Sequence, residues 1–129
     1  MTWLSGWSKR QLITVDSTYI DSDLTDFPVL VHLDNTTASG VFDELGASSK
    51  KLAIYLTDHS QQCYAEIERW DASGRKAWLW TKIPTVVSGS NTHLYLYYDS
   101  SKADNSSYVG TRGSTAGTVI GFAAIIIKI

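Results

Sequence analysis

Two glutamates, Glu66 and Glu68, have the residue type and the spacing for acid–base chemistry. On an extended strand, residues two apart share one face, and their side chains lie about 6.5–7 Å from each other. Paired carboxylates near that separation can hydrolyse a glycosidic bond, one as the acid and the other as the base or nucleophile. The alternative is structural, because the glutamates can instead form cross-strand ion pairs with Lys82 or Arg75 of the next strand.

Aromatic residues occupy the same face as these glutamates at alternate positions of three strands. Sugars stack on exposed aromatic rings while carboxylates and amides bind their hydroxyl groups, so this face is a candidate carbohydrate platform. Alternatively, another strand layer or a loop covers the face and makes the aromatic residues a second core wall. The candidate ligand-binding residues are Tyr64, Glu66, Glu68, Trp70, Trp78, Trp80, Lys82, Tyr95 and Tyr97.

Four aspartates crowd the connection after the first predicted strand: Asp16, Asp21, Asp23 and Asp26. Oxygen-rich loops can hold calcium, which takes roughly 6 to 8 ligands. The spacing matches no defined calcium loop, however, and aspartates also form turns without any ion. We therefore expect turn-forming roles, with a structural calcium ion as the alternative.

The histidines and the cysteine do not form a ligand set in the sequence. His32, His59 and His93 lie far apart, with no carboxylate or cysteine at ligand spacing, which argues against a zinc site. Cys63 falls on an apolar face and is expected to be a small core residue. Because phosphate-loop, nucleophile and dinucleotide motifs are also absent from the sequence, we expect no catalytic residue, no metal and no cofactor.

Length and charge restrict the class of protein. The chain has 129 residues, 43% of them hydrophobic and 19% charged, which is typical of one globular domain. Eleven Lys and Arg against thirteen Asp and Glu leave a net charge of −2, too balanced for nucleic-acid binding. The first residues do not resemble a secretory signal, so we expect synthesis in the cytoplasm and assembly into a virion or an extracellular surface.

Alternation of apolar and polar residues predicts short antiparallel strands along most of the chain. We expect strands over 10–15, 28–33, 51–57, 62–70, 75–83, 92–98 and 118–127, with one helical turn over 41–45. A tight hairpin at 71–74 joins the fourth and fifth strands, and 99–117 is expected to be a long loop. This pattern predicts an all-β, lectin-like antiparallel β-sandwich or jelly roll of about seven or more strands, with at most one short helical turn.

Within three of these strands, one set of alternating residues is mainly aliphatic. This set is expected to face the core, and it consists of Cys63, Ala65 and Ile67, then Ala77, Leu79, Thr81 and Ile83, then Leu94, Leu96 and Tyr98. The opposite faces carry the aromatic and charged residues.

The C-terminal segment 118–129 is apolar apart from Lys128 and does not alternate, so it is expected to be covered on both faces. It is shorter than the roughly 20 residues that span a bilayer, and we expect no membrane insertion. The chain then divides into a β-sandwich with an N-terminal arm over 1–117 and a tail over 118–129, which is either an internal strand or a strand exchanged between subunits. The candidate interface residues are Val119, Ile120, Phe122, Ile125 and Ile127.

Four sequence blocks, taken in order, resemble a known family. They are FPVLV at 27–31, YAEIERWD at 64–71, AWLWTKIP at 77–84 and LYLYYD at 94–99. They are similar to the family called domain of unknown function 2341, which occurs in bacterial, archaeal and phage surface or virion proteins, often ahead of a lectin-like domain. The resemblance covers about 10–110 and implies a β-rich surface module without established chemistry. Family members usually continue into a Trp-containing strand and a further domain, and this sequence departs from them there.

Residues 66–70 also resemble the catalytic motif Glu-x-Asp-x-Glu of laminarinase- and lichenase-type jelly-roll glycosidases. Here the middle Asp is replaced by Glu68 and the last acid by Trp70, which argues against catalysis. We therefore expect a non-enzymatic structural or surface-assembly module, most plausibly a phage virion protein of the decoration, fibre or tail-associated type. Its expected partners are its own copies or other virion proteins. The alternatives are a carbohydrate-binding module that attaches to a surface glycan and, more remotely, a relative of jelly-roll glycoside hydrolases.

Overall fold

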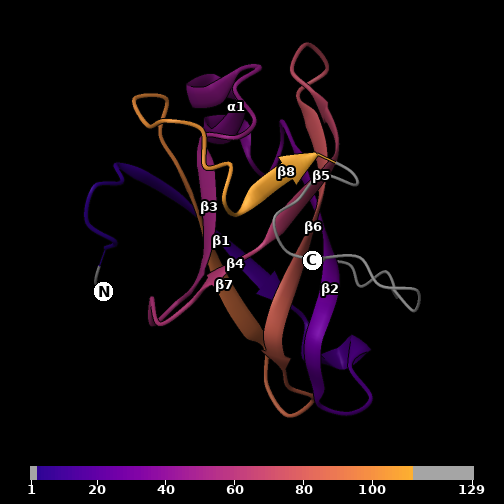
Figure 1. The fold of residues 1–129 in the computed structure, drawn as a ribbon. Helices are drawn as coiled ribbons and strands as arrows, with labels where there is room; N and C mark the ends of the chain where they lie inside the picture. Colours follow the sequence, from indigo (N-terminus) through magenta and orange to yellow (C-terminus); the bar gives the residue numbers. More distant parts are fainter. Residues whose placement is uncertain (1–2, 112–129) are drawn as a thin grey trace.

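Two four-stranded sheets pack face to face in the computed structural model, which describes residues 3–111 (Figure 1). Sheet A has the order β1-β7-β3-β4, and sheet B has the order β2-β6-β5-β8. All neighbours are antiparallel except β5 and β8, which run parallel. The predicted all-β sandwich is confirmed.

The strands of sheet A are β1 (Lys9–Val15), β7 (Thr92–Tyr98), β3 (Leu52–Leu56) and β4 (Gln62–Cys63). Those of sheet B are β2 (Leu24–Asp34), β6 (Lys76–Val86), β5 (Ala65–Asp71) and β8 (Val109–Thr111).

The core lies between the sheets and is built from the alternate residues that face inwards. Leu79 of β6 and Leu94 of β7 are fully buried in it, as expected from the alternation. The one polar member of these faces, Thr81, donates its hydroxyl hydrogen to the backbone oxygen of Tyr64 at 3.0 Å. The predicted core faces are therefore confirmed, including Cys63, whose thiol pKa is raised by burial to about 12.

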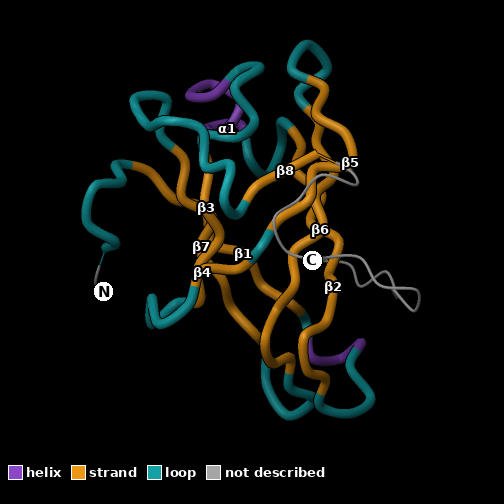
Figure 2. The backbone as a smooth tube through the Cα atoms, in the orientation of Figure 1, coloured by secondary structure: helices purple, strands orange, loops and turns teal. Residues whose placement is uncertain are grey.

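Short helices and turns close the two ends of the sandwich (Figure 2). The predicted helical turn is the helix α1 (Ser39–Leu45), at the same end as the β5–β6 hairpin. It ends at Gly46, whose φ of 53° is a left-handed conformation that glycine tolerates better than other residues. The 3₁₀ helix η1 (Ser17–Tyr19) lies at the opposite end, before β2. Among the described residues, the longest helix is far too short to cross a membrane.

The predicted single strand over 62–70 is wrong, because this segment crosses from one sheet to the other. β4 pairs with β3 in sheet A, and β5 pairs with β6 in sheet B. The crossing occurs at Tyr64, whose backbone oxygen also accepts a hydrogen bond from the backbone N–H of Lys82 at 3.2 Å.

A β-bulge in β5 reverses the predicted side of Trp70. The pairing register between β5 and β6 shifts between Ile67 and Arg69, so Glu68 is an extra residue in the strand. Glu68 and Arg69 both lie on the outer side, and Trp70 turns inwards. There its ring packs against Phe42 of α1, with ring centroids 5.3 Å apart, and its indole N–H donates to the backbone oxygen of Gly46 at 2.7 Å.

Two further predictions differ from the structure. Pro28 lies inside β2 rather than at its first residue, which is tolerated because β2 is an edge strand. The expected loop over 99–117 contains the strand β8, too short for its periodicity to be detected. The predicted strand over 118–127 lies outside the described residues.

Candidate functional site

The nine predicted ligand-binding residues do not form one platform, because the sandwich separates them. Tyr95 and Tyr97 lie on the outer face of sheet A. Trp78, Trp80 and Lys82 lie on the outer face of sheet B. Those two faces point away from each other, and the predicted single aromatic face is therefore wrong. Strand alternation identifies inner and outer residues but cannot say to which sheet a strand belongs.

The N-terminal arm covers the aromatic residues of sheet A. The Tyr97 side chain is fully buried, and its hydroxyl oxygen accepts hydrogen bonds from the backbone N–H of Leu4 at 3.1 Å and from Arg10 at 3.2 Å. Rings of Trp3 and Trp7 pack against the Tyr97 ring, with centroids 6.0 and 6.2 Å away. This coverage matches the alternative in which the aromatic residues form a second core wall.

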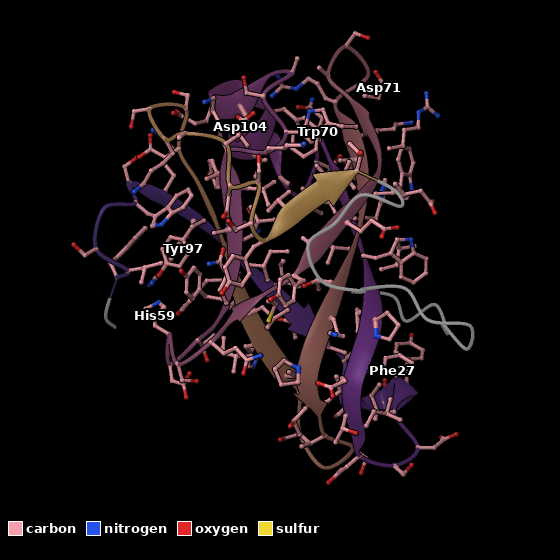
Figure 3. All side chains as sticks on the ribbon, viewed as in Figure 1. Phe27, His59, Trp70, Asp71, Tyr97 and Asp104 are labelled. Atoms are coloured by element: carbon pink, nitrogen blue, oxygen red, sulfur yellow. The ribbon has the colours of Figure 1, made fainter. Side chains whose placement is uncertain are left out.

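Tyr95 is covered in the same way. The guanidinium of Arg10 lies 3.9 Å from the Tyr95 ring centroid and 4.0 Å from that of Trp3. On the other flank, His59 lies close to Tyr97, and Figure 3 shows the two side chains together beside sheet A. Only 4% of Tyr95 is exposed, so a ligand cannot stack on this ring without displacing the arm.

The sheet B outer face consists of three rows of side chains that run across the strands. The first row joins His32 of β2, Trp78 of β6 and Arg69 of β5, which are aligned by the strand register. His32 stacks on Trp78 with ring centroids 4.9 Å apart, and the Arg69 guanidinium lies 5.6 Å from the centroid of a Trp78 ring. Arg69 also forms an ion pair with Asp71 at 3.7 Å.

The second row contains Leu30, Trp80, Glu66 and Gly110, in that order across β2, β6, β5 and β8. Trp80 is 7% exposed, and its indole N–H donates to the carboxylate of Glu68 at 3.2 Å. The bulge that displaces Trp70 is thus the feature that brings Glu68 to Trp80.

The third row contains Pro28, Lys82, Tyr64 and Tyr108. The Tyr64 and Tyr108 rings stack with centroids 4.8 Å apart, and the Lys82 ammonium lies 5.9 Å from the Tyr64 ring centroid. The predicted ion pairs of the glutamates with Lys82 or Arg75 are not formed within residues 3–111, because the Lys82 ammonium lies near the Tyr64 ring and Arg75 pairs with Asp43 on α1.

Among the aromatic and charged residues of this face, the sequence prediction missed His32, Arg69 and Tyr108. His32 was detectable, since it alternates with the buried Val31 and Leu33. Arg69 was assigned to no face because the bulge has no local sequence signature. Tyr108 belongs to the segment that was expected to be a loop.

A pocket of about 410 Å³ lies on the outer face of sheet A, apart from the sheet B outer face. It is lined by Leu12, Thr57, Asp58, His93 and Tyr95, and half of the Leu12 surface is exposed. Hydrogen bonds from the hydroxyl and the amide of Ser60 lower the pKa of Asp58, so this carboxylate is ionised at neutral pH. The pocket combines an apolar wall with a negative charge.

Two of the four aspartates considered for calcium have separate structural partners. Asp16 accepts hydrogen bonds from the amide and hydroxyl of Thr18, and Asp23 accepts them from Ser88. Residues 3–111 contain no group of three or more His, Cys, Asp or Glu side chains placed to hold a metal ion.

The comparison with protein families identifies the chain. The family model "Domain of unknown function (DUF2341)" matches residues 48–122, more than half of the sequence. This chain belongs to the DUF2341 family. The resemblance noted in the sequence is thereby confirmed. No curated protein and no solved structure matches it.

The DUF2341 match covers the middle of the sandwich and most of the sheet B outer face. It begins before β3 and includes β4 to β8, and therefore contains Glu66, Arg69, Trp78 and Trp80. The strands β1 and β2 precede the matched region, so His32 and Leu30 do not lie within it.

Proposed function

We propose that this DUF2341 chain is a non-enzymatic assembly module that docks on other protein chains through the sheet B outer face. The observation that supports the proposal is that the rings of this face are already stacked within the chain. His32 and Arg69 lie against Trp78, and Tyr108 and Lys82 lie against Tyr64. A sugar would have to displace these side chains in order to stack.

The residue types of this face support a protein partner. The central parts of protein interfaces are enriched in Trp, Tyr and Arg, whose large side chains bury much area at low entropic cost. Trp78, Tyr64 and Tyr108 are each partly exposed, and Arg69 is exposed. Side chains that already stack on one another within the chain are ordered before binding, which lowers the cost of association.

The resemblance to surface and virion proteins supports a virion as the particle in which this docking takes place. We propose a phage virion protein of the decoration, fibre or tail-associated type, which assembles with its own copies or with other virion proteins.

Sedimentation velocity of the full chain over a range of concentrations tests the proposal. We expect the mass to rise above the 14.3 kDa of one chain, and we expect Trp78→Ala and Arg69→Glu to abolish this rise. Tyr19→Ala is the matched control, since Tyr19 is 67% exposed but lies on η1, away from the face. A mass that stays at one chain at every concentration would contradict self-assembly.

Carbohydrate binding is the second candidate, and the pocket beside Tyr95 favours it. A volume of about 410 Å³ suits a small ligand, and Asp58 and His93 can bind hydroxyl groups next to the apolar Leu12. A glycan array probed with the parent chain and with Asp58→Asn tests this candidate. Glycan binding that Asp58→Asn removes would support it over assembly.

The proposal of a non-enzymatic module is tested separately through the two glutamates. The bulge makes Glu68 an extra residue in β5, where it accepts a hydrogen bond from Trp80. We expect no β-glucan hydrolysis by the parent chain. Hydrolysis that disappears in a Glu66→Gln/Glu68→Gln double variant would contradict this.

A further inference from the structure

Two neighbouring pockets form a trough that leads from the outer face of sheet A to the β6–β7 connection. The first is the pocket of about 410 Å³ beside Leu12, and the second has a volume of about 380 Å³. The two pockets share the walls Thr57, Asp58 and His93. Leu12 lines only the first pocket, whereas Leu56 and Val87 line only the second. The trough therefore has a charged middle between two apolar ends.

The side chains of this trough are accessible to a ligand. Half of the Leu12 surface is exposed, and Asp58 and His93 are exposed as well. Both hydrogen bonds that Ser60 donates to Asp58 end on Oδ1, at 2.9 and 2.7 Å. They hold the carboxylate in one orientation and leave Oδ2 to meet an incoming cation. The ligand that fits the trough is thus a cation attached to apolar groups.

The tail over 118–129 carries both kinds of group. Lys128 is its only charged side chain, and isoleucines precede and follow it in the sequence. An ammonium group binds a carboxylate by a charge-assisted hydrogen bond. Aliphatic side chains that leave water against Leu12 or Val87 add a hydrophobic contribution. The charge and the apolar pattern of the tail therefore complement those of the trough.

We propose that the trough of one copy of this chain binds residues 125–129 of a second copy, with Lys128 paired to Asp58. The inference rests on the proposed assembly function and names the segment and the surface through which two copies join. The described chain ends on β8, at an edge of sheet B. A tail that returned to its own trough would have to pass around the sandwich to the outer face of sheet A. The tail of a neighbouring copy needs no such detour.

Charge reversal in the full chain, followed by sedimentation velocity, tests this pairing. We expect Asp58→Lys and Lys128→Glu, each alone, to weaken association about tenfold or more, because each brings like charges together. An equal mixture of the two variants should associate like the parent, since every trough then meets a tail of opposite charge on the other variant. Asp21→Lys makes the same charge change at an exposed residue outside the trough, and we expect it to assemble like the parent.

The mixture separates exchange between copies from a tail bound within one chain. A tail in its own trough would be restored in the Asp58→Lys/Lys128→Glu double variant but not by mixing the single variants. Asp58→Asn keeps an oxygen that can accept from Ser60 and removes only the charge, and we expect its association to be weaker than that of the parent. Rescue by the double variant without rescue by mixing would overturn the inference. So would single variants that assemble like the parent, or a parent chain that never associates.

These outcomes are distinguishable from a failure of the proposed function. If Trp78→Ala abolishes association while both charge variants assemble like the parent, the sheet B outer face stands as the docking surface and the trough contact is wrong. If mixing restores association while Trp78→Ala has no effect, the trough contact stands and the sheet B outer face is not the docking surface. A glycan that binds through Asp58 in a chain whose charge variants assemble normally would make the trough a sugar site and overturn the inference.

Discussion

The hydroxyl of Tyr97 lies 2.6 Å from Nε2 of His59 and donates its proton to that nitrogen. The direction follows from the other two bonds, because the same oxygen already accepts hydrogen bonds from Leu4 and Arg10. A phenol has a single proton to donate. One buried hydroxyl thus joins the N-terminal arm, β1 and the β3–β4 turn.

Replacing Tyr97 with Phe should loosen the N-terminal arm without disturbing the core. The change leaves the Leu4 amide, Arg10 and His59 without their shared partner, and a lost buried hydrogen bond costs about 1–3 kcal/mol. We expect a lower free energy of unfolding in urea and faster hydrogen exchange at the Leu4 amide. Tyr19→Phe, at an exposed position, should change neither quantity. Unchanged exchange at Leu4 in Tyr97→Phe would show that this hydroxyl does not hold the arm.

Two glycines should respond differently to the same substitution. Gly46 has a φ of 53°, where an L-residue is strained by about 1–2 kcal/mol. Gly89 lies in a turn, with nothing within 4 Å of an added Cβ and without a left-handed φ. We therefore expect Gly46→Ala to destabilise the fold by that amount and Gly89→Ala to have almost no effect, as measured by urea unfolding. Equal stabilities for the two variants would contradict the role assigned to Gly46.

Trp70 should act as the attachment of the helix to the sandwich. Trp70→Phe keeps a ring against Phe42 but loses the bond from the indole N–H to Gly46, worth about 1 kcal/mol. Trp70→Ala also loses the ring, and large-to-small changes at such sites cost about 3–5 kcal/mol. Denaturant unfolding of the two variants should give this order of stability. An alanine variant as stable as the phenylalanine variant would mean that the helix is held by other contacts.

The folded state should lose stability as the pH falls through the acid range, because Glu44 becomes protonated there. Hydrogen bonds from Ser100 and Lys9 lower its pKa from 4.5 to about 2 in the folded chain. A carboxyl with a lowered folded-state pKa stabilises the fold fully above its unfolded pKa. That contribution is lost as the pH falls from about 4.5 towards 2. Asp99, whose pKa is lowered by hydrogen bonds from Ser101 and Ser8, acts in the same direction.

Unfolding temperatures measured across this acid range check the expectation. Ser100→Ala removes the hydroxyl that donates to Glu44 and should flatten the pH dependence. Ser106→Ala, at an exposed serine, is the control and should leave it unchanged. An equally steep dependence in Ser100→Ala would assign the acid sensitivity to other carboxylates.

Deleting residues 118–129 should abolish assembly and leave the remaining chain able to fold. The segment is apolar without alternation, and we propose that it is exchanged between subunits. We then expect the truncated chain to be a soluble, folded monomer by circular dichroism and sedimentation. If it does not fold, the segment belongs to its own core and exchange is wrong.

Much of the fold was predictable because the inner faces of the strands are consistently apolar. Leu79 and Leu94 alternate with large aromatic residues, and that period of two identifies strands and core whatever the topology. The division of the aromatic residues between the outer faces of the two sheets was not predictable in this way. Trp80 and Tyr95 have the same local pattern, and only long-range strand pairing places them on opposite faces of the sandwich. Likewise, the bulge at Glu68 adds a single residue, which no local pattern records.

The buried thiol of Cys63 allows the rate at which the two sheets separate to be measured directly. Cys63 is the only cysteine in the sequence, lies where the chain passes from one sheet to the other, and is 1% exposed. With the pKa of this thiol raised to about 12, the folded chain offers almost no thiolate to an alkylating or disulfide reagent. Each labelling event therefore requires the two layers to separate around β4. At high reagent concentration, the labelling rate becomes the rate of that separation, read out without a probe added to the chain.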